Sequence, residues 1–442
     1  MKGGLATWAG RIALGAVLAV AAAAAAMPWI LPGDAAESRR IAAAAIFAAS
    51  YLALAVGRVP GLAIDRAGIA LVGACLMVGA GALPLDAAYR AIDLDTITLL
   101  LGMMIVVASL RLSGFFALAN DFVMRRVHGP VTLLAAVAAV SGLFSAFLVN
   151  DAICLVLAPL IVDLTLALKR RPAPYLLAVA MASNVGSVAT LTGNPQNIMI
   201  GSFSRIPYAA FAASLTPVAL AGLAMTVALI WRMHRRDLGR RPSSLPAPGR
   251  APRSNRALVA RALGGTLAMI ALFFAGQPPA KAAILVGGLL LLTRRLRSVR
   301  VYAEIDWSLL LMFAGLFIVV AGAQAQLLTP DVIAAVGRLD LDDPARLAGL
   351  TAVLSNLVSN VPAVLLLEPF VHALRDQDLG WKLVAMASTL AGNFTVLGSI
   401  ANLIVVEQAA RRGVEIGFWT YFRVGAPLTA LSIAAGTLWL AR

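Results

Sequence analysis

Long apolar runs alternate with short polar and basic segments along most of the 442 residues. Many of these runs approach the roughly 20 residues that an α-helix needs to cross a bilayer. Two runs are interrupted by polar residues, one at Asn150-Asp151 within 131–168 and the other at 190–197 within 175–199. Lipid offers no partner to backbone polar groups, so such breaks survive only within protein or beside a cavity. We therefore expect both breaks to line a binding site.

The interrupted stretch has a second copy further along the chain. Residues 150–161 align without gaps with residues 360–371, and 179–183 then align with 384–388. Matches of Ala and Leu alone would be coincidence in this composition, but Asn, Pro, Thr and Gly match in one order. The matched pairs include Asn150 with Asn360, Pro159 with Pro369, Thr190 with Thr395, Gly193 with Gly398 and Asn197 with Asn402. A duplication with paired broken helices is typical of a secondary transporter whose site lies at the repeat interface.

The pattern predicts an all-α polytopic membrane protein of about 11 transmembrane helices in two inverted repeats, each with a re-entrant hairpin and a broken helix. Each repeat has an odd number of crossings, so the second enters the membrane from the opposite side. We expect an extra N-terminal transmembrane helix over 1–35, a first inverted repeat over 36–231, a basic cytoplasmic linker over 232–256 and a second inverted repeat over 257–442.

Composition and charge support a membrane protein rather than a nucleic-acid-binding one. The chain is 61% hydrophobic and 13% charged, whereas a soluble domain has about 25% charged residues. The net charge of +15 comes from Arg in short loops and in the linker, as cytoplasmic loops require. We therefore expect no nucleic-acid partner, a lipid bilayer around the chain, and a multi-pass protein of the cytoplasmic (inner) membrane with its N-terminus inside. Cys75 and Cys154 have neither disulfide nor metal-ligand spacing.

The candidate site residues follow from the polar breaks. Asparagine at both hairpin tips can donate and accept hydrogen bonds, which suits an oxyanion or hydrated ion, although a purely structural bond is the alternative. Asp151 is either a proton carrier or a cap of the helix that leaves the tip. Half-helix N-termini would attract an anion, while freed carbonyls would hold Na+. The substrate- or ion-binding candidates are Asn150, Asp151, Thr190, Thr192, Gly193, Asn194, Asn197, Ser359, Asn360, Thr395, Gly398, Ser399 and Asn402.

The sequence indicates an energy source outside the chain. It contains no G-x-x-x-x-G-K-[ST] motif, so we expect an ion gradient of H+ or Na+, or a separate ATPase subunit, to drive transport. We expect no enzymatic activity, no cofactor and no resident metal. Na+ could bind only as a coupling ion, through Asn150, Asn360 and nearby carbonyls.

Three segments resemble a known group of permeases. NDAICLVLAPLIV, ASNVGSVATLTGNPQNIMIG and SNVPAVLLLEP resemble the ion transporter superfamily, which includes arsenite permeases, related Na+/H+ antiporters, and citrate and divalent-anion symporters. The resemblance covers nearly the whole chain. It implies eleven spans in an inverted repeat, substrate held between the hairpin tips and the broken spans, and a homodimer.

The hairpin tips depart from one branch of that group. Sodium–dicarboxylate symporters carry a Ser-Asn-Thr triplet at both tips, whereas this chain has Val149-Asn150-Asp151 and Ser359-Asn360-Val361. The tips look more like the arsenite-permease branch and favour proton coupling through Asp151. The leading hypothesis is a secondary transporter for a small anion or oxyanion, with arsenite-type efflux as its most specific version. The alternatives are a Na+/H+ antiporter, a Na+-coupled di- or tricarboxylate symporter, and a passive anion channel.

Overall fold

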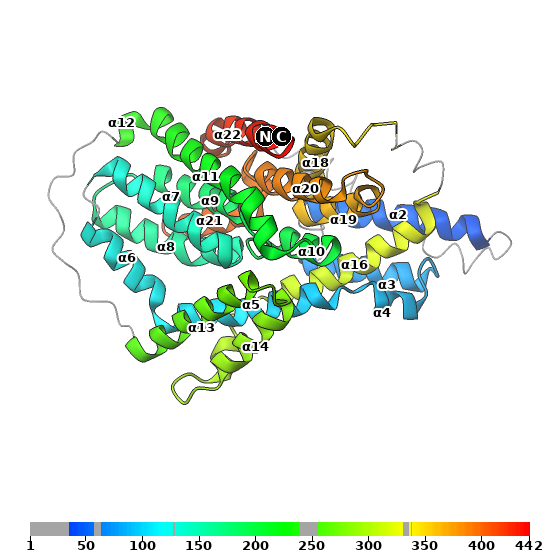
Figure 1. Ribbon diagram of the computed structural model, residues 1–442, viewed down its shortest axis with the longest axis horizontal. Helices are drawn as coiled ribbons and strands as arrows, with labels where there is room; N and C mark the ends of the chain where they lie inside the picture. Colours follow the sequence, from blue (N-terminus) through cyan, green and yellow to red (C-terminus); the bar gives the residue numbers. More distant parts are fainter. Residues whose placement is uncertain (1–34, 57–62, 127–128, 239–254, 330–335, 337) are drawn as a thin grey trace.

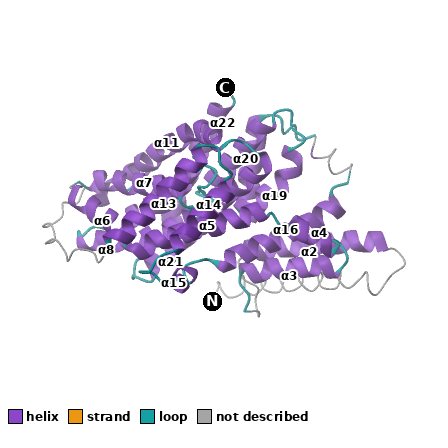
Figure 2. Ribbon diagram, turned by 60° about the horizontal axis from the view of Figure 1, so that its bottom comes forward, coloured by secondary structure: helices purple, strands orange, loops and turns teal. Residues whose placement is uncertain are grey.

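A computed structural model describes residues 35–56, 63–126, 129–238, 255–329, 336 and 338–442 (Figure 1). Within these residues the secondary structure is entirely helical, and no strand occurs (Figure 2). The predicted all-α class is therefore confirmed. The helix expected over 1–35 and most of the linker expected over 232–256 lie outside the described residues.

The two halves share most of their helices in the same order, although α6 (Phe115–Arg126) and α12 (Arg235–Leu238) have no counterpart among the described residues of the second half. The first half comprises α2 (Ala35–Val56), α3 (Arg66–Gly79), α4 (Leu85–Ala91), α5 (Leu94–Ser113), α6 (Phe115–Arg126), α7 (Pro130–Phe147), α8 (Asn150–Ala167), α9 (Ala173–Ser187), α10 (Pro195–Ser204), α11 (Tyr208–Met233) and α12 (Arg235–Leu238). The second half comprises α13 (Arg256–Phe274), α14 (Pro279–Leu291), α15 (Ser298–Tyr302), α16 (Trp307–Leu327), α18 (Pro344–Val358), α19 (Asn360–Val371), α20 (Gln377–Ala391), the 3₁₀ turn η2 (Val396–Gly398), α21 (Ile400–Ala410) and α22 (Phe418–Leu440).

The crossings of each half are three helices, one broken span and a final long helix. They are α2, α3, α5, α9–α10 and α11 in the first half, and α13, α14, α16, α20–α21 and α22 in the second. Helices α5, α7, α8, α11, α13 and α16 are long and apolar enough to span a bilayer, and α3, α14, α19 and α21 are shorter apolar helices. The chain is thus a multi-pass membrane protein.

The halves are interleaved rather than separate. Helix α3 packs against α16 of the other half, and the corresponding α14 packs against α5. Glycines permit both approaches: a Cβ on Gly102 of α5 would overlap the backbone of Ala283, and one on Gly315 of α16 would overlap the backbone of Ala70. The same contact therefore occurs twice, each time between the two halves.

The first hairpin is re-entrant because its tip ends inside the protein. Helix α7 ends at Phe147 and α8 begins at Asn150, which is 4% exposed. The backbone N–H of Asn150 donates to the carbonyl of Gly193 at 2.9 Å. The tip thus rests on the break of the neighbouring span.

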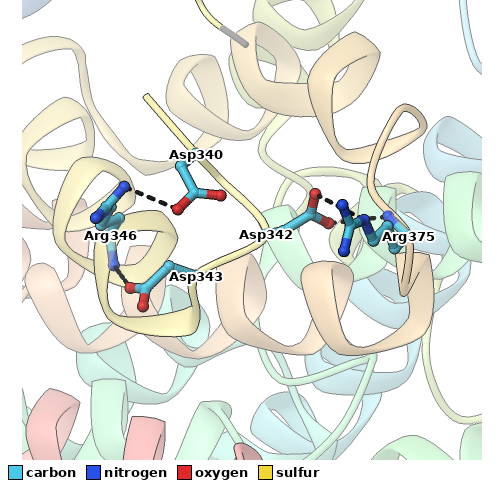
Figure 3. A network of polar contacts seen from close by, with 5 residues as sticks. All are labelled: Asp340, Asp342, Asp343, Arg346 and Arg375. Carbon is cyan, nitrogen blue, oxygen red and sulfur yellow. Dashed lines mark hydrogen bonds and ion pairs between the residues drawn. The ribbon is translucent and has the colours of Figure 1, made fainter. Parts of the chain in front are cut away.

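The second hairpin is fastened at its open end by an acidic loop (Figure 3). Asp340 pairs with Arg346 at 2.9 Å, and Asp343 caps α18 by accepting the Arg346 N–H at 2.8 Å. Asp342 accepts the backbone N–H of Arg375, beyond the other arm, at 3.0 Å. The loop thereby holds the two arms of the hairpin together.

The broken spans restart where a capping residue predicts. Helix α9 ends at Ser187, and α10 begins at Pro195 after the N-cap Asn194, whose side chain accepts the Asn197 N–H at 2.9 Å. The predicted restart is confirmed, since Asn is a preferred N-cap and Pro suits the first helical position. In the second half, Ser399 caps α21 in the same way, through the Ala401 N–H.

Candidate functional site

A cavity of about 50 Å³, here called the main cavity, lies between the two hairpin tips and the two restarted half-helices. It has space for a few water molecules or one small ion. Its polar and charged lining comes from both halves, while α2 and α16 supply an apolar wall. The lining residues are Leu54, Arg66, Asn150, Asp151, Pro195, Gln196, Leu309, Met312, Phe313, Leu316, Ser359, Asn360, Val361, Pro362, Ser399 and Ile400.

Four helix N-termini meet at the main cavity. The lining includes the first residues of α8 (Asn150), α10 (Pro195), α19 (Asn360) and α21 (Ile400). Each N-terminus presents the positive end of a helix dipole, although the N–H groups of Asn150, Asn197 and Ala401 already donate within the protein. The duplicated hairpins and breaks thus aim four partial positive charges at one small volume, an arrangement that favours an anion.

Two charged side chains face each other across this cavity. Arg66, the first residue of α3, is half-buried, and in the part of the chain described no carboxylate lies within the 4.0 Å of an ion pair. Asp151, the second residue of α8, interacts electrostatically with Arg66 and faces the backbone N–H of Ala401 at the start of α21. The N-cap position of α8 is occupied by Val149. The carboxylate of Asp151 therefore belongs to the cavity.

Within the described residues, each tip asparagine presents a buried oxygen that lacks a hydrogen-bond partner. These are the Oδ1 atoms of Asn150 and Asn360, at equivalent positions of the two hairpins. Both residues line the main cavity. A buried acceptor without a partner is unusual in a folded protein, so these oxygens are available to a bound group that can donate.

Behind the cavity, Asn184 joins the two halves. Its Nδ2 donates to Oδ1 of Asn393 at 2.9 Å and of Asn402 at 3.0 Å. Its Oδ1 accepts from Nδ2 of Asn150 at 3.0 Å and from Oγ of Ser399 at 3.1 Å. One buried amide thus holds the first tip and the second break in register.

The second half repeats this arrangement with a hydroxyl. Thr389 stands in α20 where Asn184 stands in α9, and its Oγ1 accepts from Nδ2 of Asn194 at 3.1 Å and from Nε2 of Gln196 at 3.1 Å. The same hydroxyl lies 3.5 Å from Oδ1 of Asn197. Each broken span is therefore tied to the break of the other half.

The structure brings only part of the predicted set to the cavity. Asn150, Asp151, Ser359, Asn360 and Ser399 line it. The others lie outside its lining, in or beside the two breaks. These are Thr190, Thr192, Gly193, Asn194, Asn197, Thr395, Gly398 and Asn402.

Two threonines predicted to bind the substrate or ion point away from the main cavity. Thr190 Oγ1 donates to the carbonyl of Ala146 at the end of α7. Thr192 Oγ1 bonds the hydroxyl of Tyr208 in α11 at 2.8 Å. Their hydroxyls therefore fasten the first break to its neighbours.

Sequence reasoning missed several residues of the site. Arg66 and Gln196 line the cavity, and Asn184, Thr389 and Asn393 form the network behind it. Asn184 carried a usable signal, because a lone amide within an apolar helix needs a partner at membrane depth. Arg66 carried none, since a basic residue before an apolar run is typical of any cytoplasmic loop.

Comparisons with known proteins agree with the predicted resemblance to the ion transporter superfamily. The family model described as citrate transporter (CitMHS) matches residues 50–391. An uncharacterized transporter of Mycobacterium tuberculosis is 30% identical, over 90% of this chain and 97% of its own. The silicon efflux transporter LSI3 of Oryza sativa is 28% identical, over 86% of this chain and 93% of its own length. The YdaH transporter of Alcanivorax borkumensis shares the fold, with a TM-score of 0.56, 15% identity, and coverage of 91% and 97%.

Proposed function

Because the chain belongs to the citrate transporter family, we propose that it is a secondary active transporter that moves a small anion or oxyanion across the cytoplasmic membrane in exchange for, or together with, protons. The proposed transporter has no enzymatic role and needs no cofactor. The N-terminus lies inside, as the Arg-rich loops indicate.

The convergence of four helix N-termini on one cavity carries this proposal. Helix N-termini bind anions without any charged side chain. Arg66 adds a full positive charge on the same cavity, and its guanidinium matches the planar edge of a carboxylate or oxyanion. A cation would meet Asp151 favourably but would face all four N-termini.

The unpaired oxygens of Asn150 and Asn360 narrow the substrate class. They require a donor, which a fully ionised carboxylate or phosphate lacks. A small hydroxylated oxyacid offers hydroxyl donors to these oxygens and oxygen acceptors to the helix N–H groups and Arg66. Arsenite-type efflux is the most specific version of the proposal, and a relative named for silicon efflux points to the same chemistry.

Proton coupling is favoured over sodium coupling because the backbone carbonyls of both helix breaks already accept hydrogen bonds from asparagine side chains. Nδ2 of Asn197 donates to the carbonyls of Ser187 and Thr190 at 3.1 and 3.0 Å. In the second break, Nδ2 of Asn402 donates to the carbonyls of Gly392 and Thr395 at 2.7 and 3.1 Å. Each amide thus occupies carbonyl oxygens of its break that could otherwise bind Na+. Asp151 remains as the carboxyl group that can carry a proton.

Transport in proteoliposomes tests the proposal. Purified protein is reconstituted, and uptake of arsenite, silicic acid, phosphate and citrate is measured under an imposed pH gradient, Na+ gradient or neither. We expect uptake of at least one oxyacid that follows the pH gradient and needs no Na+. A strict Na+ requirement, or transport of Na+ with no anion, would refute the proposal in favour of the symporter or antiporter branch.

A further inference from the structure

A second cavity also has Asp151 in its wall. It measures about 100 Å³, is here called the side cavity, and shares Asp151 and Leu309 with the main cavity. Its walls are Met104, Val107, Ala108, Arg111, Val149, Asp151, Ala152, Leu155, Val156, Glu304, Asp306, Leu309 and Ile404. One carboxyl group therefore borders two separate spaces.

The charged residues of the side cavity lie where the two halves meet. Arg111 is in the last turn of α5, whereas Glu304 and Asp306 precede α16. Arg111 Nη1 and Glu304 Oε2 form an ion pair whose side chains are 41% and 25% exposed. Asp306 caps α16 by accepting the Leu309 N–H at 3.0 Å, and it interacts electrostatically with Asp151. The side cavity is thus lined by three carboxylates, those of Glu304, Asp306 and Asp151.

We propose that the side cavity is a proton path to Asp151, separate from the main cavity that binds the anion. The partly exposed Arg111–Glu304 ion pair closes the end of the side cavity that faces water. This inference rests on the proposed proton coupling. Asp306 lines the same cavity as the ion pair and interacts electrostatically with Asp151, so in this proposal a proton passes from water to Asp306 and then to Asp151 through water in the cavity. The remaining wall is apolar, which confines the path to these carboxyl groups.

The surroundings of Asp151 suit a transfer between two paths. Arg66 faces it from the main cavity, while Arg111, Glu304 and Asp306 share the side cavity with it. On the adjoining α21, the Ala401 N–H faces its carboxylate, and the thiol of Cys154, on its own helix, is bonded to Ser183. Asp151 can therefore take a proton from one side while its charge acts on an anion at the other.

The ion pair is better suited to opening than to holding the fold. A half-exposed pair stabilises a protein only weakly, and this pair joins α5 of one half to the segment before α16 of the other. Rotation of either partly exposed side chain is enough to separate Arg111 from Glu304, with no movement of the packed helices α5 and α14.

Thiol labelling tests access without any transported anion. Ala152→Cys, in the side cavity, is placed in the full chain with the exposed Cys75 replaced by Ser, and it is reacted with a small cationic methanethiosulfonate. Glu304→Gln should raise the labelling rate several-fold, whereas Val361→Cys in the main cavity should react at an unchanged rate. An Ala152→Cys labelling rate that Glu304→Gln leaves unchanged would overturn the proposal. An equal increase in the labelling rates of Ala152→Cys and Val361→Cys would also overturn it.

Proton entry into liposomes that contain the dye pyranine gives the second readout, with no anion added. Glu304→Gln should admit protons faster than wild type, and adding Asp306→Asn should restore the wild-type rate. Asparagine keeps the capping bond and removes only the acid. The matched controls are Asp163→Asn, which breaks another ion pair between the halves with Arg412, and Asp93→Asn, which alters the equivalent cap of α5.

The outcomes separate this inference from the proposed function. A wild-type proton rate in Glu304→Gln, or a fast rate that survives Asp306→Asn, would reject the side cavity as the path. Uptake of arsenite or silicic acid by the wild-type protein would still support the proposed function in either case. Absence of all oxyacid uptake would reject the proposed function while leaving the labelling result valid.

Discussion

Nδ2 of Asn184 lies 3.0 Å from Oδ1 of Asn402, so the broken span of the first half donates a hydrogen bond to the broken span of the second. The reciprocal contact joins Thr389 to Asn197. The cavity is thereby framed by two breaks that hold each other, with the hairpin tips resting on them. This core keeps four helix N-termini in fixed positions around a small volume.

Asn184→Leu should be strongly destabilising. It removes two donated and two accepted bonds and leaves Asn150, Asn393 and Asn402 with unpaired groups in a buried site. A buried group without a partner costs about 1–3 kcal/mol, although bonds within membranes are often weaker. We expect a loss of about 2–4 kcal/mol, visible as a lower Tm in detergent.

The control for Asn184 is Asn356→Leu. Asn356 also donates two hydrogen bonds, in its case to the backbone carbonyls of Ala352 and Ala391, but its side chain is exposed. We expect its Tm to change little. Equal shifts in the two variants would show that Asn184 is not the connection that holds the halves.

Gly193→Ala should prevent formation of the first break. A Cβ there would overlap the carbonyl oxygen and Cα of Ser187, both backbone atoms that cannot turn aside. Gly288→Ala is the control, because a Cβ on Gly288 meets nothing within 4 Å and Ala favours a helix. Monodispersity on size-exclusion chromatography should be lost in the first variant and kept in the second. A monodisperse Gly193→Ala protein would contradict the close approach.

Arg66→Gln should weaken anion binding. A hydrogen bond to a charged group is worth about 1.5–3 kcal/mol, so we expect at least about a tenfold rise in the half-saturating concentration for uptake. Arg66→Lys should recover part of the loss because it keeps the charge without the guanidinium fork. Arg346→Gln removes an exposed ion pair with Asp340 and should have no effect. An unchanged half-saturating concentration in Arg66→Gln would remove Arg66 from the site.

Membrane orientation is tested at two exposed positions. Arg294 lies beyond α14 in a predicted cytoplasmic loop, and Asp340 lies in the predicted outer loop before α18. With Cys75 replaced by Ser, a membrane-impermeant maleimide should label Asp340→Cys in intact spheroplasts and Arg294→Cys only after lysis. The reverse pattern would invert the positive-inside assignment.

The sequence was sufficient for features that depend on a local rule. Apolar length predicted the spans, duplication predicted both breaks, and Asn194-Pro195 predicted the restart of α10. The sequence did not predict where side chains point in the irregular segment 188–194, because no helical periodicity applies there. Thr190 and Thr192 consequently bond to Ala146 and Tyr208 outside the cavity. Arg66 reaches the cavity only because α3 packs against α16 of the other half, which no local pattern contains.

The central claim is that Asp151, in the wall of the main cavity, links anion movement to protons, and Asp151→Asn tests it most directly. Asparagine keeps the size and hydrogen-bonding ability of the side chain but cannot carry a proton. Arsenite or silicic acid exchange at equal pH, and accumulation under an imposed pH gradient, are measured in the same proteoliposomes. The account predicts that the variant exchanges the oxyacid but no longer accumulates it. Accumulation equal to wild type, with unchanged dependence on the pH gradient, would show that Asp151 is not the coupling group.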